Sequence, residues 1–181
     1  MSDISIAGFK DLLWNTLVVN SQNTRNGMPI KREKAFMDIA LKRAKEMKLF
    51  TKPDSSVDAD ALVCLENDEI IFQENNNRKY SPTHDILEDW ALVRYVAEKF
   101  DEYLGPEFFI NLGNEPSIRR AFRLWTEDYL NNQNHKIVEL IKISLESDSI
   151  EKYWTDEILT AIFRSDNSDC FFKALEKELL L

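Results

Sequence analysis

The sequence predicts a mainly α-helical protein with one short β-hairpin. Along most of the 181 residues, apolar side chains recur at steps of three and four, which is the period of an α-helix. Four glycines and five prolines are too few for collagen-like, linker-like or glycine-rich loop architectures. The exception is a β-prone run at 70–73, followed by an asparagine-rich turn.

The N-terminal part predicts two helices, at about 5–19 and 31–48, joined by a polar loop. The apolar face of the first consists of Ile6, Phe9, Leu13 and Leu17. One face of the second carries Phe36, Ile39, Ala40 and Met47. The opposite face is basic, with Lys31, Arg32, Lys34, Lys42, Arg43, Lys45 and Lys48.

A third helix and a hairpin follow. Residues 58–65 predict about two helical turns, with Ala61, Leu62 and Leu65 facing inward. Residues 69–81 predict two paired strands around the turn at 74–77. Three helices followed by a hairpin are the plan of a winged-helix domain.

The remaining chain predicts helices only. Ser81 as the cap and Pro82 as the first helical residue predict a helix to about residue 100. Its buried stripe is expected to be Ile86, Trp90, Val93, Ala97 and Phe100. Later stripes are Ile118, Ala121, Phe122, Trp125 and Tyr129; Ile137, Leu140, Ile141 and Leu145; Trp154, Ile158 and Ile162; and Phe171, Leu175 and Leu179. Short polar loops between them predict an α-helical bundle or the stub of a helical-repeat solenoid.

Three segments result from this pattern. Gly105, Pro106, Gly113 and Pro116 predict a boundary within 105–116. We therefore expect an N-terminal helix and loop at 1–27, a winged-helix domain at 28–104 and a helical domain at 105–181.

Composition narrows the functional classes. No stretch approaches the ~20 apolar residues of a membrane span, and no basic region precedes an apolar run at the N-terminus. A cytoplasmic protein without a membrane partner is therefore expected, with Cys64 and Cys170 as reduced, buried thiols. Two cysteines and two histidines (His84 and His135) scattered singly do not supply a zinc site, so no metal is expected.

Charge divides the chain unevenly. Residues 1–52 have a net charge of +5 and residues 53–181 of −14, which together give −9. This indicates two surfaces with different partners, or attraction between the two parts. The basic face of the second helix makes a winged-helix DNA-binding transcriptional regulator an alternative. Because Asp58, Asp60 and Glu66 surround the helix before the hairpin, nucleic acid is not the favoured partner.

His84 is the strongest candidate for a binding residue. It follows the hairpin in the first turn of a predicted helix, where unpaired backbone N–H groups and the helix dipole can hold an anion. Its imidazole adds a donor that can reach a phosphate. The alternative is that His84 packs or caps beneath the hairpin. No nucleophile or converging carboxylates accompany it, so no catalytic residue is assigned.

An arginine cluster at Arg119, Arg120 and Arg123 has two interpretations. It can meet an acidic partner or a phosphate. It can also form a solvated face that pairs with Glu115 and Glu127. A helical protein-interaction scaffold is a further alternative for the whole chain.

Segment 80–96, Tyr-Ser-Pro-Thr-His-Asp-Ile-Leu-Glu-Asp-Trp-Ala-Leu-Val-Arg-Tyr-Val, resembles a pattern in STAND NTPases, the NACHT and NB-ARC type of signalling ATPase. In that family a His-Asp-Ile/Val-Leu motif and an acidic-aromatic-Ala stretch close the winged-helix domain and begin the next helix. Segments 118–125 and 154–162 are similar to the helical segments that follow in bacterial members.

This resemblance implies a regulatory role. The family's winged-helix histidine contacts the nucleotide phosphates in the ADP-bound resting state, and the matching position is His84. The domain holds the switch closed until a sensor region detects a ligand, after which the protein oligomerises; many bacterial members act in antiviral defence. A protein ligand at the helical region is implied too.

The chain departs from the family in one respect: it has neither a Walker A loop nor a Walker B strand. Its only glycines are Gly8, Gly27, Gly105 and Gly113, whose spacing cannot form a phosphate loop. We therefore expect no ATP hydrolysis by this chain alone and no cofactor in isolation. ADP or ATP would be bound only with a P-loop NTPase domain, supplied in cis or in trans.

Overall fold

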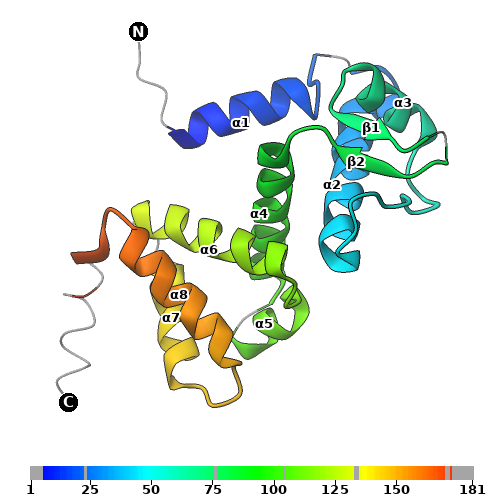
Figure 1. The fold of residues 1–181 in the computed structure, drawn as a ribbon. Helices are drawn as coiled ribbons and strands as arrows, with labels where there is room; N and C mark the ends of the chain where they lie inside the picture. The colour runs from blue at the N-terminus through cyan, green and yellow to red at the C-terminus, as the bar shows by residue number, and fades with distance from the viewer. Residues whose placement is uncertain are drawn as a thin grey trace, which may run out of the picture. The chain divides into compact units, whose positions relative to one another are not determined.

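The computed structural model describes residues 6–22, 24–75, 77–103, 105–132, 135–169 and 172. The predicted mainly α fold with a small hairpin is confirmed: this part of the chain contains eight α-helices, a short 3-10 turn and one two-stranded antiparallel sheet (Figure 1). The chain divides into two compact units, Met1–Leu92 and Val93–Leu181. The division into an N-terminal helix and loop at 1–27, a winged-helix domain at 28–104 and a helical domain at 105–181 stays a prediction.

The first unit is built around one long helix. Its elements are α1 (Ile6–Leu17), η1 (Arg25–Gly27), α2 (Met28–Glu46), α3 (Ala59–Asn67), β1 (Ile71–Gln73), β2 (Tyr80–Pro82) and the beginning of α4 (Asp85–Glu102). Gly27, at a φ of 68°, turns the chain into α2, and Pro29 lies in the helix's first turn, where its missing N–H costs nothing. The Asp58 carboxylate caps α3 by accepting the backbone N–H groups of Asp60 and Ala61.

The predicted hairpin is present, and a third segment extends it. Ile71 pairs with Pro82 and Gln73 with Tyr80. Thr51, in the connection between α2 and α3, bridges to Tyr80 through two backbone hydrogen bonds of 3.0 and 2.8 Å. The segment after α2 is thereby attached to the outer side of β2.

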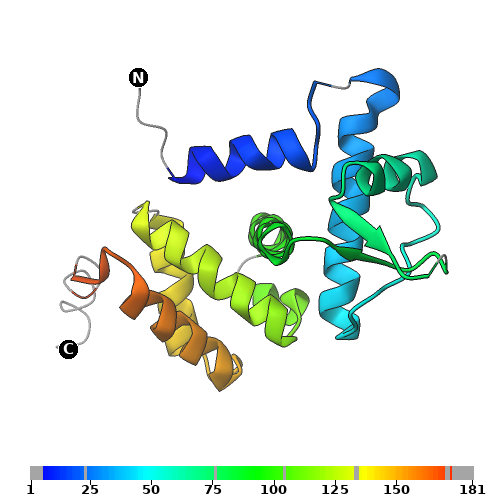
Figure 2. The same cartoon turned by 45° about the horizontal axis from the view of Figure 1, so that its top comes forward.

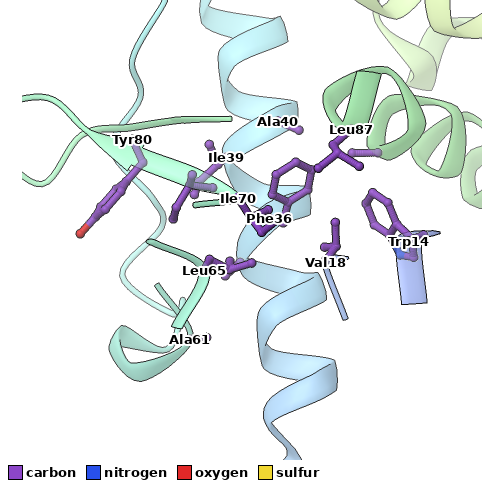
Figure 3. Close-up of a cluster of buried hydrophobic side chains, with 13 residues drawn as sticks. Trp14, Val18, Phe36, Ile39, Ala40, Ala61, Leu65, Ile70, Tyr80 and Leu87 are labelled. Carbon is purple, nitrogen blue, oxygen red and sulfur yellow. The ribbon is translucent and has the colours of Figure 1, made fainter. Parts of the chain in front are cut away.

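One apolar core joins these elements (Figure 3). The close-up shows labelled side chains from α1 to α4 gathered around α2, with Ile70 beside them, whereas the Tyr80 ring extends away from that helix. Trp14 and Phe36 meet edge to face with their ring centroids 5.7 Å apart. Core members from α1 to α4 include Trp14, Val18, Phe36, Ile39, Ala40, Ala61, Leu65, Ile70 and Leu87.

The predicted face of α1 differs from the buried one, whereas the predicted face of α2 is buried at Phe36, Ile39 and Ala40 and differs only at Met47. Trp14 of α1 and Val18 just after the helix are buried, whereas Phe9 is 52% and Leu17 39% exposed. The helix is apolar on more than one side, so spacing alone could not select the buried face. Met47, placed on the same face as Phe36, Ile39 and Ala40, is exposed because it ends that helix in a left-handed conformation.

The start and stripe of the fourth helix also differ from the prediction. Ser81 and Pro82 belong to β2, and α4 begins at Asp85, because strand pairing takes priority over the local capping signal. Ile86 is exposed, while Leu87 and Ala91 are buried. The helix contributes residues to the cores of two units, so its buried positions do not follow a single stripe.

The second unit is helical throughout its described part. It contains the rest of α4, then α5 (Pro106–Leu112), α6 (Pro116–Asn131), α7 (His135–Glu146) and α8 (Lys152–Arg164). The last three helices pack against one another (Figure 2). Their predicted stripes are confirmed at all positions with described side chains except Tyr129, which is only half-buried; the Leu145 side chain lies outside that description. The stripe at Phe171, Leu175 and Leu179 lies outside the described residues.

Aromatic rings fill the centre of this unit. Phe108 and Phe122 lie next to Trp125, with ring centroids 5.9 and 6.0 Å away from it, and all three are almost fully buried. Phe100 of α4 meets the Trp125 ring at 4.8 Å. Trp125 therefore acts as a packing residue of this unit.

Candidate functional site

The residue singled out by the sequence, His84, lies in the turn between β2 and α4. Thr83 donates its backbone N–H to the Ile70 carbonyl at 3.0 Å, which continues the hairpin ladder by one step. The His84 carbonyl then accepts the first helical hydrogen bonds, from Leu87 at 3.1 Å and Glu88 at 3.4 Å. His84 is thus held by its backbone at the start of α4.

The His84 side chain is exposed and makes no hydrogen bond or ion pair with the described residues. The alternative in which it packs or caps beneath the hairpin is therefore not what the structure contains. The backbone N–H groups of Asp85 and Ile86 likewise find no acceptor in the described part of the chain. An imidazole and two unpaired backbone donors consequently occupy one helix end.

The charge of this helix end is mixed. Asp85 and Glu88 both lie in the first turn of α4, where the dipole stabilises carboxylates. A carboxylate beside the imidazole opposes an incoming phosphate unless further positive charge accompanies that phosphate. Taken alone, the turn offers donors to an anion but lacks the charge to retain one.

A part-buried arginine holds both ends of the His84 turn. Arg43 of α2 donates through Nη1 to the Ser81 hydroxyl at 2.9 Å. The same nitrogen lies 3.3 Å from Glu88 Oε2, and the two charged side chains are only 14% and 10% exposed. Sequence reasoning missed this contact, because periodicity carries no signal for partners so far apart along the chain.

Much of the predicted basic face of α2 is paired within the unit. Lys31 forms an ion pair with Asp58 at 2.8 Å, and Arg32 forms one with Asp68 at 2.6 Å. The hydrogen bond between the Lys31 and Asp58 side chains raises the pKa of Lys31 and lowers the pKa of Asp58. Lys42 approaches Asp38 and Asp54 at 3.8 Å. Lysines and arginines engaged in this way are not arranged as a row of free phosphate contacts.

The arginine cluster of the helical unit is arranged differently from the prediction. Arg123 pairs with Glu157 of α8 at 2.9 Å, and Arg119 lies over the Tyr153 ring at 5.3 Å. Glu127, expected to pair with the cluster, is instead 3.5 Å from Arg164. The cluster therefore attaches α6 to α8.

A small cavity opens in the same unit between α5 and the start of α8. Its volume is about 260 Å³, and its wall combines aromatic, aliphatic and polar side chains. The lining includes Phe109, Ile110, Asn114, Glu151, Tyr153 and Trp154. No sequence pattern pointed to this cavity, because α5 and the start of α8 are separated by two helices.

The remaining candidate ligands lie apart. Cys64 is a free thiol and is half-buried rather than fully buried as predicted. Cys170 lies outside the described residues, and His135 is the first residue of α7. Within the described ranges, no three His, Cys, Asp or Glu side chains gather closely enough to hold a metal ion.

Comparison with known proteins supplies no family. The sequence matches no protein-family model. No curated protein is significantly similar to it. Among the described helices, none has both the length and the apolar character needed to cross a membrane.

Proposed function

We propose that this chain is the regulatory winged-helix and helical sensor portion of a STAND-type ATP-binding signalling protein. In this role it couples the nucleotide state to a conformational change, and antiviral defence is the proposed biological setting. The observation that carries the proposal is an exposed His84 directly after a β-hairpin, at the start of α4. The resemblance of segment 80–96 to the family's pattern points to the same residue.

The arrangement of the first unit supports the winged-helix part of the proposal. Helices α2 and α3 precede a two-stranded ribbon, and Thr51 attaches a third extended segment to β2. The small sheet packs on a helical core, and a long helix follows it. This arrangement suits a domain that presents its β-hairpin and the start of the next helix to another module.

ADP or ATP would reach His84 only together with a P-loop domain, in cis or in trans. That domain would supply the phosphate cradle and the metal, and so also the positive charge that the His84 turn lacks. The chain itself would contribute the imidazole and the Asp85 and Ile86 backbone donors. Its role is therefore regulatory and not catalytic, and a cytoplasmic location is part of the proposal.

Nucleotide retention tests this function. The chain is tagged in its source cells and recovered with its P-loop module, and the half-life of bound ADP is measured after dilution. His84→Ala should shorten this half-life by about ten-fold or more, since it removes a hydrogen bond to a charged group. His135→Ala is the matched control and should leave it unchanged. Equal retention by the wild type and His84→Ala would remove His84 from the mechanism.

The two alternatives differ in their support. DNA binding is disfavoured by the internal ion pairs of α2 and by the exposed Asp60 on α3. A protein-interaction role has one specific observation in its favour, which is the cavity beside the 77% exposed Ile110. In the proposed protein, this region is where a protein ligand would be sensed.

A further inference from the structure

The geometry points to Arg43 as the positioning residue of the His84 turn. The chain leaves β2 at Ser81 and completes the first turn of α4 at Glu88, and His84 lies between these residues. Arg43 contacts both of them through a single nitrogen, at 2.9 Å from the Ser81 hydroxyl and 3.3 Å from the Glu88 carboxylate. One guanidinium therefore fixes both ends of the segment that carries the imidazole.

The contacts within the turn make this fixation effective. The Glu88 backbone N–H donates to the His84 carbonyl at 3.4 Å, so holding the Glu88 side chain also holds the residue that bonds His84. The Ser81 hydroxyl accepts from Arg43 and lies 3.4 Å from the Pro82 carbonyl, to which it can donate. Because Ser81 and Glu88 are 1% and 8% exposed, water competes little for these bonds.

An ion pair that is largely removed from water in this way is a poor source of net stability. Removing two charges from water costs about as much as their attraction returns, and apolar replacements of similar size are often neutral or stabilising. The pair instead orients the groups it joins. If its role is orientation, removing the whole pair should disturb the His84 turn without lowering the stability of the unit in proportion.

The inference rests on the proposed function only in assigning a nucleotide phosphate as the group that the imidazole contacts. Whether Arg43 positions the His84 turn can be tested without nucleotide. Amide hydrogen exchange is measured on the isolated chain for Leu87 and Glu88, whose N–H groups bond to the His84 carbonyl, and for Ile39 in the core. In Arg43→Met, exchange of the Leu87 and Glu88 amides should increase about ten-fold more than exchange of the Ile39 amide, whose own increase reports the loss of global stability when one partner of the pair is removed. Arg43→Lys should restore part of the protection.

Two further variants separate positioning from stability. Arg43→Met/Glu88→Leu should keep the wild-type unfolding midpoint and still show fast exchange at Leu87. Arg123→Met is the matched control, because it removes a comparable part-buried ion pair from the other unit and should leave the Leu87 and Glu88 amides unchanged. Unchanged exchange in folded Arg43→Met would overturn the inference. Failure of both Arg43→Met and the double variant to fold would do so too, by assigning the pair to overall stability.

A second arm distinguishes this inference from the proposed function. In the assembly with its P-loop module, Arg43→Met should shorten ADP retention about ten-fold when His84 is present. In a chain that already carries His84→Ala, adding Arg43→Met should not change ADP retention further. If His84→Ala alone changes nothing, the proposed function fails, while the exchange result still decides whether Arg43 positions the turn. If Arg43→Met acts equally in both backgrounds, positioning through His84 is wrong.

Discussion

Arg32 offers the sharpest test of how the first unit is held together. Its side chain is 1% exposed, and it donates from Nε to the Val18 carbonyl and from Nη2 to the Leu17 carbonyl, both at 2.9 Å. Helix α1 ends at Leu17, so these acceptors are among the carbonyls that have no partner within the helix. Arg32 therefore joins the end of α1 to α2.

Arg32→Met keeps the length and helix propensity of the side chain but removes these bonds. The Val18 carbonyl is then left in a buried place without a donor, which costs about 1–3 kcal/mol, and the charged hydrogen bond to Leu17 is lost as well. The ion pair with Asp68 adds little, because that carboxylate is 47% exposed and remains hydrated. We expect the free energy of unfolding to fall by about 2–4 kcal/mol.

The assay is urea denaturation followed by far-UV circular dichroism. Lys34→Met is the matched control, since Lys34 is an exposed residue of the same helix, and its effect should stay within about 0.5 kcal/mol. Asp68→Asn should cost less than about 1 kcal/mol. An Arg32→Met effect no larger than that of Lys34→Met would refute the reasoning that the Leu17 and Val18 carbonyls, at the end of α1, depend on this guanidinium.

Three further predictions follow from the same structure. The hydrogen bond from Lys31 lowers the pKa of Asp58 below its ordinary value of 3.8, so the charge pair stabilises fully above that value and is lost as the pH falls through the lowered pKa. Asp58→Asn keeps a capping oxygen but removes the charge. The urea midpoints of Asp58→Asn and the wild type should therefore differ less below pH 3.8 than above it, and a difference that does not change with pH would contradict the role of the charge pair. Phe122→Ala should cost about 3–5 kcal/mol in urea unfolding, whereas Phe163→Ala, at a 71% exposed position, should be nearly neutral, and similar losses would be inconsistent with the described core. Duplex DNA should not shift in gels at micromolar protein and low salt, and a shift that weakens steeply with salt would revive the DNA-binding alternative.

The sequence predicted most helices and the hairpin because their signals are local. Asp58 caps α3, Pro116 begins α6, and the stripes of the last helices follow one core face. The start of α4 was misplaced for the opposite reason. Ser81 and Pro82 carry a strong local capping signal, but pairing of Pro82 with Ile71 and the Arg43 hydrogen bond keep them in the strand.

The candidate site was predictable only in part. The position of His84 after a hairpin could be read from its neighbours, since hairpin and helix are both local structures. The side chains that hold the His84 turn and the end of α1 could not be predicted, because in the sequence Arg43 and Arg32 are two of the seven positions on one basic helix face. Their buried partners, Glu88 and the carbonyls at the end of α1, come from distant parts of the chain and leave no periodic signal.

The central claim is that the His84 imidazole contacts a nucleotide phosphate, and a distance measurement tests it most directly. Solid-state NMR of the assembly with its P-loop module would measure dephasing between imidazole ¹⁵N and ADP ³¹P, in a His135→Gln background that leaves one histidine in this chain. A direct hydrogen bond places these nuclei roughly 4 Å apart, so strong dephasing is the predicted result. Bound ADP that produces no dephasing of the His84 signal would contradict the account.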